Sequence, residues 1–109
     1  MTHVLIFKSS DGKFKGFNCL GHAEYDEYGS DIVCASVSVL VINTINSLEE
    51  LTDQKFTLTV NEEEGLIHCE FISEADEHSE LLMKSMILGL EGIKQEYGKQ
   101  YLDLTFEEV

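Results

Sequence analysis

The stretch that decides the fold is residues 31–51, DIVCASVSVLVINTINSLEEL. It is apolar on almost every side as far as Ile45 and then ends in charged residues. A run of about 20 residues is too long for a typical strand, so the pattern predicts a helix in spite of its many β-branched side chains. Ser30 or Asp31 is expected to be the N-cap, because short polar side chains accept hydrogen bonds from free N–H groups. A strand followed by a turn remains an alternative for the first third of the run.

Two extended segments precede this helix. Residues 2–8 and 13–22 flank Asp11 and Gly12, two residue types that tolerate positive φ at the centre of a type I′ turn. The chain is therefore expected to begin with a β-hairpin. Residues 23–30, AEYDEYGS, have no regular apolar period and are predicted to form a loop.

A second hairpin and a second helix follow. Residues 54–60 and 66–72 alternate apolar with polar side chains around a predicted turn at residues 61–65. Ser73 to Asp76 matches a capping box, and Gly98 is a natural residue to end a helix. Apolar residues at near-helical spacing lie between them: Leu82, Met86, Leu90, Ile93 and Tyr97.

Residues 101–107 alternate again and are expected to close the chain as a fifth strand, with Leu102, Leu104 and Phe106 pointing inward. The predicted order is ββαββαβ, an α+β fold with two helices and a mainly antiparallel sheet. No linker or low-complexity segment interrupts it, so residues 1–109 are expected to form a single domain.

The composition is that of an ordinary globular domain, since 43% of the 109 residues are hydrophobic and 26% are charged. The longest apolar run, residues 39–42, is far too short to cross a membrane, and the first residues lack the features of a signal peptide. The three cysteines are an odd number at no framework spacing and are expected to be reduced thiols. We therefore expect a cytoplasmic protein that does not contact a membrane.

The charge is strongly acidic, because seven Lys and Arg residues stand against 21 Asp and Glu residues, a net charge of −14. Nucleic-acid binding depends on basic side chains that release counterions, so direct nucleic-acid binding is not expected. The same charge attracts a basic partner, although acidity is also a common means of keeping a protein in solution.

Cys34 is the first candidate for chemistry. With Asp31 as the N-cap, Cys34 is the third residue of the helix, where free N–H groups and the helix dipole favour a thiolate. His22 follows Gly21, a residue that permits an unusual backbone angle, and a loop of eight residues allows its imidazole to approach the thiol. The residues allow a Cys-His dyad. The alternative is that Cys34 is a small core residue, as most cysteines on apolar helices are.

Asp31 and Ser38 lie three residues before and four residues after Cys34, on the same helical face. Asp31 is expected to cap the helix or to orient His22. Ser38 is expected to hydrogen-bond either to the thiol or to its own preceding turn.

A zinc site is an alternative that starts from Cys19 and His22, with Cys34, His68 and Cys69 as further ligands. On a single strand, however, Cys19 and His22 project to opposite faces, and so do the neighbours His68 and Cys69. We therefore expect no metal and no cofactor. The acidic runs, residues 62–64 among them, are interpreted as solvated turns and ends.

Residues 21–38, GHAEYDEYGSDIVCASVS, resemble the signature of the bacterial ribosomal-processing cysteine proteases, in which G-H-A and a short loop precede G-x-D-I-V-C-A-x-V-S. The resemblance implies that Cys34 is the nucleophile and His22 the base, with Asp31 and Ser38 in support and Gly21 shaping the turn. It also implies a homodimer that removes an N-terminal extension from the twenty-seventh protein of the large ribosomal subunit. Such a basic substrate suits the charge of −14.

The loop between the proposed catalytic residues is expected to be a mobile lid that substrate orders. Its acidic residues would meet a basic substrate, its tyrosines would cover apolar side chains, and its glycine would keep it flexible: Glu24, Asp26, Glu27, Tyr25, Tyr28 and Gly29. A helix that is apolar on almost every side also favours a homodimer. The rival hypothesis is a non-catalytic module that binds a basic ribosomal or assembly protein, with Cys34 merely buried.

Overall fold

The computed structural model describes residues 1–21 and 28–109. The elements follow in the order β1 (Thr2–Lys8), β2 (Phe14–Gly21), α1 (Tyr28–Leu51), β3 (Phe56–Asn61), β4 (Leu66–Phe71), α2 (Glu77–Tyr97) and β5 (Leu102–Glu108). The predicted order ββαββαβ is confirmed.

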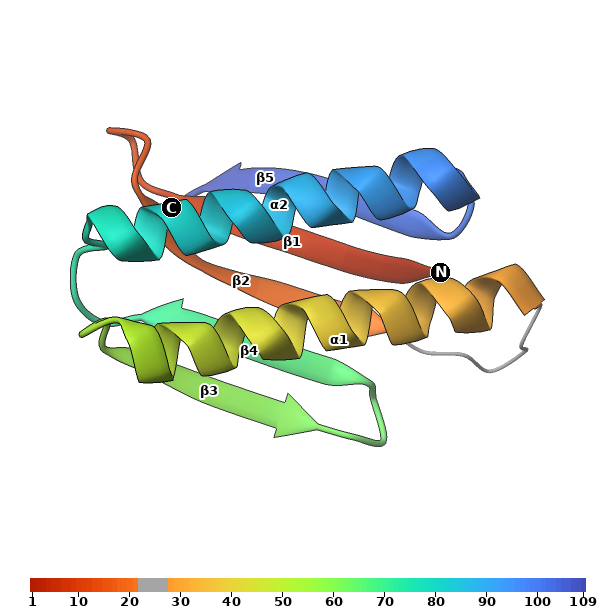
Figure 1. Cartoon of the computed structure of the whole chain (residues 1–109), viewed down its shortest axis with the longest axis horizontal. Coiled ribbons are helices and arrows are strands. Elements are labelled where there is room, and N and C mark those ends of the chain that lie inside the picture. The colour runs from red at the N-terminus through yellow and green to blue at the C-terminus, as the bar shows by residue number, and fades with distance from the viewer. Residues whose placement is uncertain (22–27) are drawn as a thin grey trace.

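The five strands form one sheet in the order β3-β4-β2-β1-β5. All neighbouring strands are antiparallel except β1 and β5, which run parallel, so the predicted α+β fold with a mainly antiparallel sheet is confirmed. Both helices lie on the same face of the sheet and run along its strands (Figure 1). The core is therefore a single layer between the helices and one sheet face.

α1 buries one stripe of its surface against the sheet. Its fully covered side chains recur every three or four residues, the spacing that places them on one helical face: Val33, Val37, Val41, Ile45 and Leu48. The sheet contributes Ile6, Phe17 and Leu102, which are completely buried. From Asp31 onward α1 is long and apolar enough to cross a membrane by length and composition alone, but its buried stripe is that of a core helix.

The start of α1 differs from the prediction. The helix begins at Tyr28, so Ser30 and Asp31 lie inside its first turn and neither is the N-cap. The prediction that residues 28–30 belong to a loop is wrong, and the alternative of a strand in the first third of the run is excluded. Residues 28–30 have no apolar period and Gly29 lowers helix propensity, so the sequence pattern gave no sign of this extra turn.

The first hairpin turns through three residues instead of two. The N–H of Gly12 donates to the carbonyl of Ser9 (2.9 Å), and the N–H of Ser9 donates to the carbonyl of Lys13 (2.8 Å). Gly12 has φ +85°, whereas Asp11 does not have a positive φ. The predicted type I′ turn is wrong, because the Asp11 carboxylate accepts a hydrogen bond from the Ser9 hydroxyl and Gly12 alone supplies the left-handed position.

The ends of α2 are defined by Asp76 and Gly98. The Asp76 carboxylate accepts a hydrogen bond from the N–H of Ser79 (2.7 Å), so Asp76 is the N-cap and the predicted capping box from Ser73 is wrong. These hydrogen bonds lower the pKa of Asp76. Gly98, with φ +100°, ends the helix by donating its N–H to the carbonyl of Lys94 (2.8 Å), as expected.

The two edge strands are covered less completely than their patterns predict. In β5, Leu102 is buried, but Phe106 is 53% exposed although it was expected to point into the core. In β3, Leu58 and Val60 are also exposed. Alternation identifies which side chains share a face, but it does not show how far the helices extend over that face.

Candidate active site

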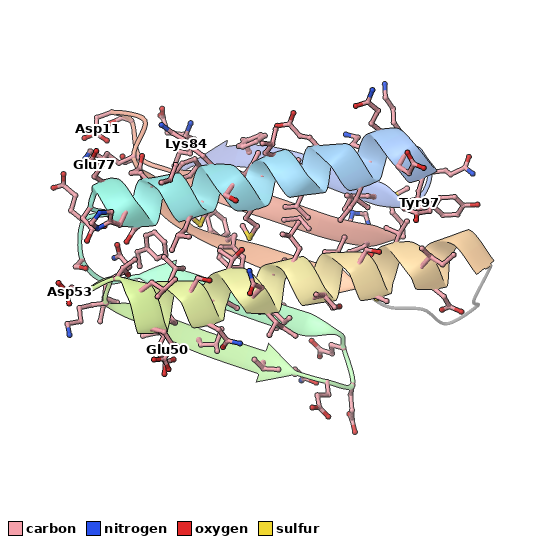
Figure 2. The ribbon with its side chains drawn as sticks, viewed as in Figure 1. Asp11, Glu50, Asp53, Glu77, Lys84 and Tyr97 are labelled. Atoms are coloured by element: carbon pink, nitrogen blue, oxygen red, sulfur yellow. The ribbon has the colours of Figure 1, made fainter. Side chains whose placement is uncertain are left out.

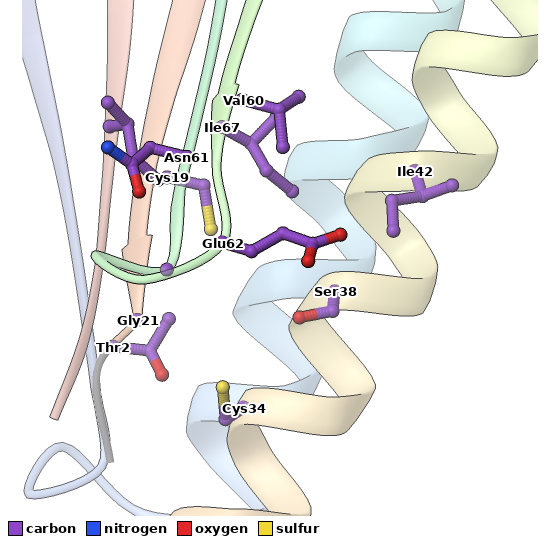
Figure 3. Close-up of a pocket in the computed structure, with 12 residues that line it drawn as sticks. Thr2, Cys19, Gly21, Cys34, Ser38, Ile42, Val60, Asn61, Glu62 and Ile67 are labelled. Carbon is purple, nitrogen blue, oxygen red and sulfur yellow. The ribbon is translucent and has the colours of Figure 1, made fainter. Parts of the chain in front are cut away.

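A cavity of about 360 Å³ lies between the end of β2, the first half of α1 and the turn that joins β3 to β4. Its size is within the range of small-ligand pockets. Figure 3 shows the side chains that converge on it from these elements. The residues that line it are Thr2, Cys19, Gly21, Cys34, Ser38, Ile42, Val60, Asn61, Glu62, Gly65, Leu66 and Ile67.

Cys34 is half-buried, and its thiol faces the cavity (Figure 3). Because α1 begins at Tyr28, Cys34 is the seventh residue of the helix and not the third. The expectation that it lies in the first turn is therefore wrong. The influence of a helix dipole falls off within that turn, so the expected stabilisation of a thiolate by the helix start does not apply to Cys34.

Gly21 lies directly beside the Cys34 thiol. A Cβ atom at this position would come within 3.2 Å of Cys34 Sγ, tighter than most real contacts of a Cβ atom. Gly21 does not have a positive φ, so the expectation that it permits an unusual backbone angle is wrong. The absence of a side chain at Gly21 instead makes room for the thiol.

A backbone hydrogen bond holds the β3–β4 turn against Gly21. The N–H of Gly21 donates to the carbonyl of Gly65 at 3.0 Å. Gly65 has φ +66°, and a Cβ atom on it would lie 1.6 Å from the carbonyl oxygen of Gly21. Only glycine fits this close approach of two backbones, which holds the turn against the end of β2.

Ser38 and Asp31 both lie on α1, on either side of Cys34. Ser38 lines the cavity one turn after Cys34 (Figure 3). The neighbouring serine of α1, Ser36, donates its hydroxyl to the carbonyl of Ile32 in the preceding turn of the helix (2.8 Å). Asp31 is exposed and lies in the first turn of the helix.

The proposed base and most of the proposed lid fall outside the part of the chain that the structure describes. These residues are His22, Glu24, Tyr25, Asp26 and Glu27. The pairing of His22 with Cys34 and the closing of a lid therefore stay predictions. The other two residues of the proposed lid, Tyr28 and Gly29, are the first two residues of α1.

The other two cysteines are buried. Burial, with a smaller contribution from the charge of Cys34, raises the pKa of Cys19 to about 11. Burial raises the pKa of Cys69 to about 12. Both thiols are neutral at physiological pH, which makes them poor nucleophiles and poor metal ligands.

The set of ligands considered for zinc is divided between the two faces of the sheet. Cys69 is buried beneath the helices, whereas the His68 side chain hydrogen-bonds to Asn18 (2.9 Å) on the opposite face. The predicted divergence of these two neighbours is confirmed. Within residues 1–21 and 28–109, no three His, Cys, Asp or Glu side chains are grouped so that they could hold a metal ion.

Sequence reasoning missed three polar residues of the cavity, Thr2, Asn61 and Glu62. Thr2 is buried, and its Oγ1 lies within 3.4 Å of the position that a Cβ atom on Gly21 would take. The register of the first hairpin pairs Thr2 with Gly21, so an alignment of the two predicted strands is a signal that could have found it. Glu62, interpreted as part of a solvated turn, also lines the cavity, and no local pattern distinguishes it from Glu63.

An accessible thiol on a helix that packs against an antiparallel sheet, beside a cavity of this size, defines the class of protein as a candidate thiol-dependent hydrolase. The comparisons with known proteins identify the family within that class. A family model described as cysteine protease Prp matches residues 1–102.

Relatives that carry the name ribosomal processing cysteine protease Prp match nearly the whole chain. One from Bacillus subtilis is 33% identical over 101 residues, which cover 89% of this chain and 90% of the relative. One from Staphylococcus aureus is 28% identical over 99 residues, which cover 91% of this chain and 93% of the relative. The chain therefore belongs to the Prp family of ribosomal processing cysteine proteases, and it is a cysteine protease. The resemblance found in residues 21–38 is confirmed.

Solved structures agree with this assignment. The crystal structure of the essential ribosomal processing protease Prp from S. aureus in complex with a substrate peptide has a TM-score of 0.90 and 26% identity, and the match covers 98% of this chain and 100% of that chain. A crystal structure from Streptococcus mutans has a TM-score of 0.84 and 28% identity, and the match covers 100% of this chain and 96% of that chain.

Proposed function

We propose that this protease removes the N-terminal extension of the twenty-seventh protein of the large ribosomal subunit, and that it does so with Cys34 as nucleophile and His22 as general base. The observation that carries the proposal is the position of the Cys34 thiol, which opens onto the cavity within 3.2 Å of where a Cβ atom on Gly21 would lie. Gly21 is covalently joined to His22, and this adjacency in the sequence supports the proposed pairing of the imidazole with the thiol.

In the proposed reaction, His22 accepts the proton of the Cys34 thiol, and the thiolate attacks the carbonyl carbon of the scissile bond. His22 then gives this proton to the leaving amine as the C–N bond breaks. A water molecule, deprotonated by His22, hydrolyses the thioester and restores the thiol. The N–H of Cys34 belongs to the helical hydrogen-bond ladder, so we propose that polar side chains of the cavity donate to the oxyanion, among them the hydroxyls of Thr2 and Ser38.

The charge of the chain supports a basic ribosomal substrate. A net charge of −14 attracts a basic partner and speeds its encounter with the enzyme. The relatives named above are ribosomal processing proteases, and the S. aureus structure contains a substrate peptide. Ribosome assembly takes place in the cytoplasm, which is where we propose that this protein acts, without a metal ion.

A homodimer is part of the same proposal. On α1, Val39 is 70% exposed, and on the edge strand β3, Leu58 is 45% exposed. Neither side chain lines the cavity. Exposed apolar side chains support an interaction surface, and a second copy of the chain would cover Val39 and Leu58.

The direct experiment incubates the protein with the extended ribosomal protein under reducing conditions and measures the product by mass spectrometry. We expect a shortened product that persists in the presence of a strong chelator, and we expect no product with Cys34→Ser or His22→Ala. Stable binding without any shortened product would contradict the proposal and favour the non-catalytic module. Loss of cleavage on chelation, restored by zinc, would contradict the metal-free dyad.

A further inference from the structure

We propose that Glu62, at the β3–β4 turn, determines substrate specificity by binding a lysine or arginine side chain of the peptide. The inference rests on the proposed function, because it assigns a role in peptide recognition to a residue of the same cavity. Nothing in the signature of residues 21–38 involves this turn.

The first observation is the direction of the side chain. Glu62 lines the cavity onto which Cys34 opens, and its carboxylate extends across it in the direction of Ser38 on α1 (Figure 3). A peptide whose carbonyl lies against the Cys34 thiol therefore places a neighbouring side chain within reach of this carboxylate.

The second observation is that the turn is held in place before any substrate arrives. The N–H of Gly21 donates to the carbonyl of Gly65 (3.0 Å), and the N–H of Gly65 donates to the carbonyl of Glu62 (3.2 Å). The side chain of Asn61 accepts a hydrogen bond from the N–H of Glu64 (3.2 Å). Glu62 is thereby tied through two hydrogen bonds to the glycine beside the nucleophile, which lowers the cost of ordering it on binding.

The third observation is the chemical character of the residues that line the cavity. Within residues 1–21 and 28–109, no ion pair includes Glu62, and no Lys or His lines the cavity. Among the residues that the structure describes, no cation therefore balances the charge of this carboxylate. Three apolar residues line the same cavity, namely Ile42, Val60 and Ile67. An apolar wall with a carboxylate at its end suits a long aliphatic stem that carries a cation, as in lysine and arginine.

The neighbouring acids provide matched controls. Glu63 and Glu64 belong to the same turn, but neither lines the cavity. A substitution of either by glutamine removes one negative charge from the same region, so it reproduces any general effect of the acidic field on a basic substrate. A specific subsite requires that only the Glu62 substitution changes the preference at one position of the peptide.

The experiment is a positional scan with peptides that span the cleavage point of the extended ribosomal protein. Lysine, glutamine or glutamate is placed at each position in turn, and kcat/KM is measured for the wild-type enzyme, Glu62→Gln, Glu62→Lys and the control Glu63→Gln. We expect one position at which wild-type enzyme prefers lysine over glutamine by about two- to fivefold, the range of an exposed ion pair. Glu62→Gln should abolish this preference, Glu62→Lys should prefer glutamate there, and Glu63→Gln should retain the wild-type preference.

Binding of the same peptides to Cys34→Ser protein, followed by fluorescence anisotropy, separates this inference from the proposed function. If the wild-type enzyme cleaves nothing but Cys34→Ser protein binds with a preference that depends on Glu62, the subsite stands and the proposed function fails. If cleavage occurs and Glu62→Gln keeps the wild-type preference at every position, the subsite is overturned and the protease remains. If the protein neither cleaves nor binds the peptides, the proposed function and the Glu62 subsite are both contradicted.

Discussion

The three cysteines have different surroundings, and the difference decides which of them can react. Cys34 is half-buried on the cavity, whereas Cys19 and Cys69 are buried with their pKa values raised to about 11 and about 12. We expect iodoacetamide at about pH 6.5 to label Cys34 first, because alkylation requires both access and thiolate character. Peptide mapping after a brief treatment checks this. Faster labelling of Cys19 or Cys69 would contradict the assignment of the nucleophile.

The two buried thiols also predict how stability responds to alkaline pH. Their pKa lies near 9 when unperturbed, so above about pH 9 the unfolded chain loses these protons while the folded chain retains them. Their contribution to the free energy of unfolding is therefore complete below pH 9 and is lost as the pH rises toward 11 to 12. Urea denaturation at about pH 8, 9.5 and 10.5 measures the decline. The double variant Cys19→Ala with Cys69→Ala should decline less steeply, and an identical slope would contradict the prediction.

At the same scale, the sequence predicted the residues of the site better than it predicted why they are needed. The spacing of Cys34 and Ser38 places both on one helical face, and both line the cavity. The function of Gly21 was misjudged, because a sequence shows that a side chain is absent but not which atom occupies the space. Glu62 was missed for the same kind of reason. Its contact with the cavity arises from a hydrogen bond between Gly21 and Gly65, which are 44 positions apart in the sequence.

At the scale of elements, periodicity predicted every helix and strand, whereas their ends depended on single hydrogen bonds. Asp76 is the N-cap of α2 because its carboxylate reaches the N–H of Ser79, whereas Ser73, three residues earlier, offered the capping pattern without that geometry. α1 extends back to Tyr28 through residues that carry no apolar period. Strand burial likewise depended on which strands became edges, and that information lies in the sheet order.

The packing of the two helices gives a prediction at two glycines of α2. A Cβ atom on Gly92 meets nothing within 4 Å, whereas one on Gly89 would lie 2.7 Å from Leu40 Cδ2 on α1. Gly92→Ala should stabilise the protein by about 1 kcal/mol, since alanine favours a helix more than glycine does. The gain in the free energy of unfolding from Gly89→Ala should be smaller than that from Gly92→Ala by about 1 kcal/mol or more, because Leu40 must move.

Urea denaturation of both variants measures the difference. Combining Gly89→Ala with Leu40→Ala removes the contact and should show a favourable coupling between the two sites. An equal gain from both glycine variants would show that Leu40 yields without cost.

At the scale of the whole molecule, the acidic side chains are distributed mainly over ends and turns. Glu50, Asp53 and Glu77 are exposed, and all three lie at the same end of the molecule (Figure 2). The cavity lies between the far end of the sheet and the N-terminal half of α1 (Figures 1 and 3). In the proposed function, the net charge of −14 acts on a basic substrate as a general field, and the proposed subsite at Glu62 adds a local contact.

The exposed apolar face of α1 carries the last prediction, which concerns oligomeric state. Val39 on α1 and Leu88 on α2 have nearly the same exposure, 70% and 73%, and neither lines the cavity. If the dimer forms through α1, Val39→Asp should dissociate it, because a buried unpaired carboxylate opposes association, whereas Leu88→Asp should leave it intact. Light scattering at micromolar concentration should give twice the chain mass for the wild-type protein and for Leu88→Asp, and one chain mass for Val39→Asp. A monomeric wild-type protein would mean that the apolar stripe of α1 serves only its own fold, and dissociation by Leu88→Asp alone would move the interface to α2.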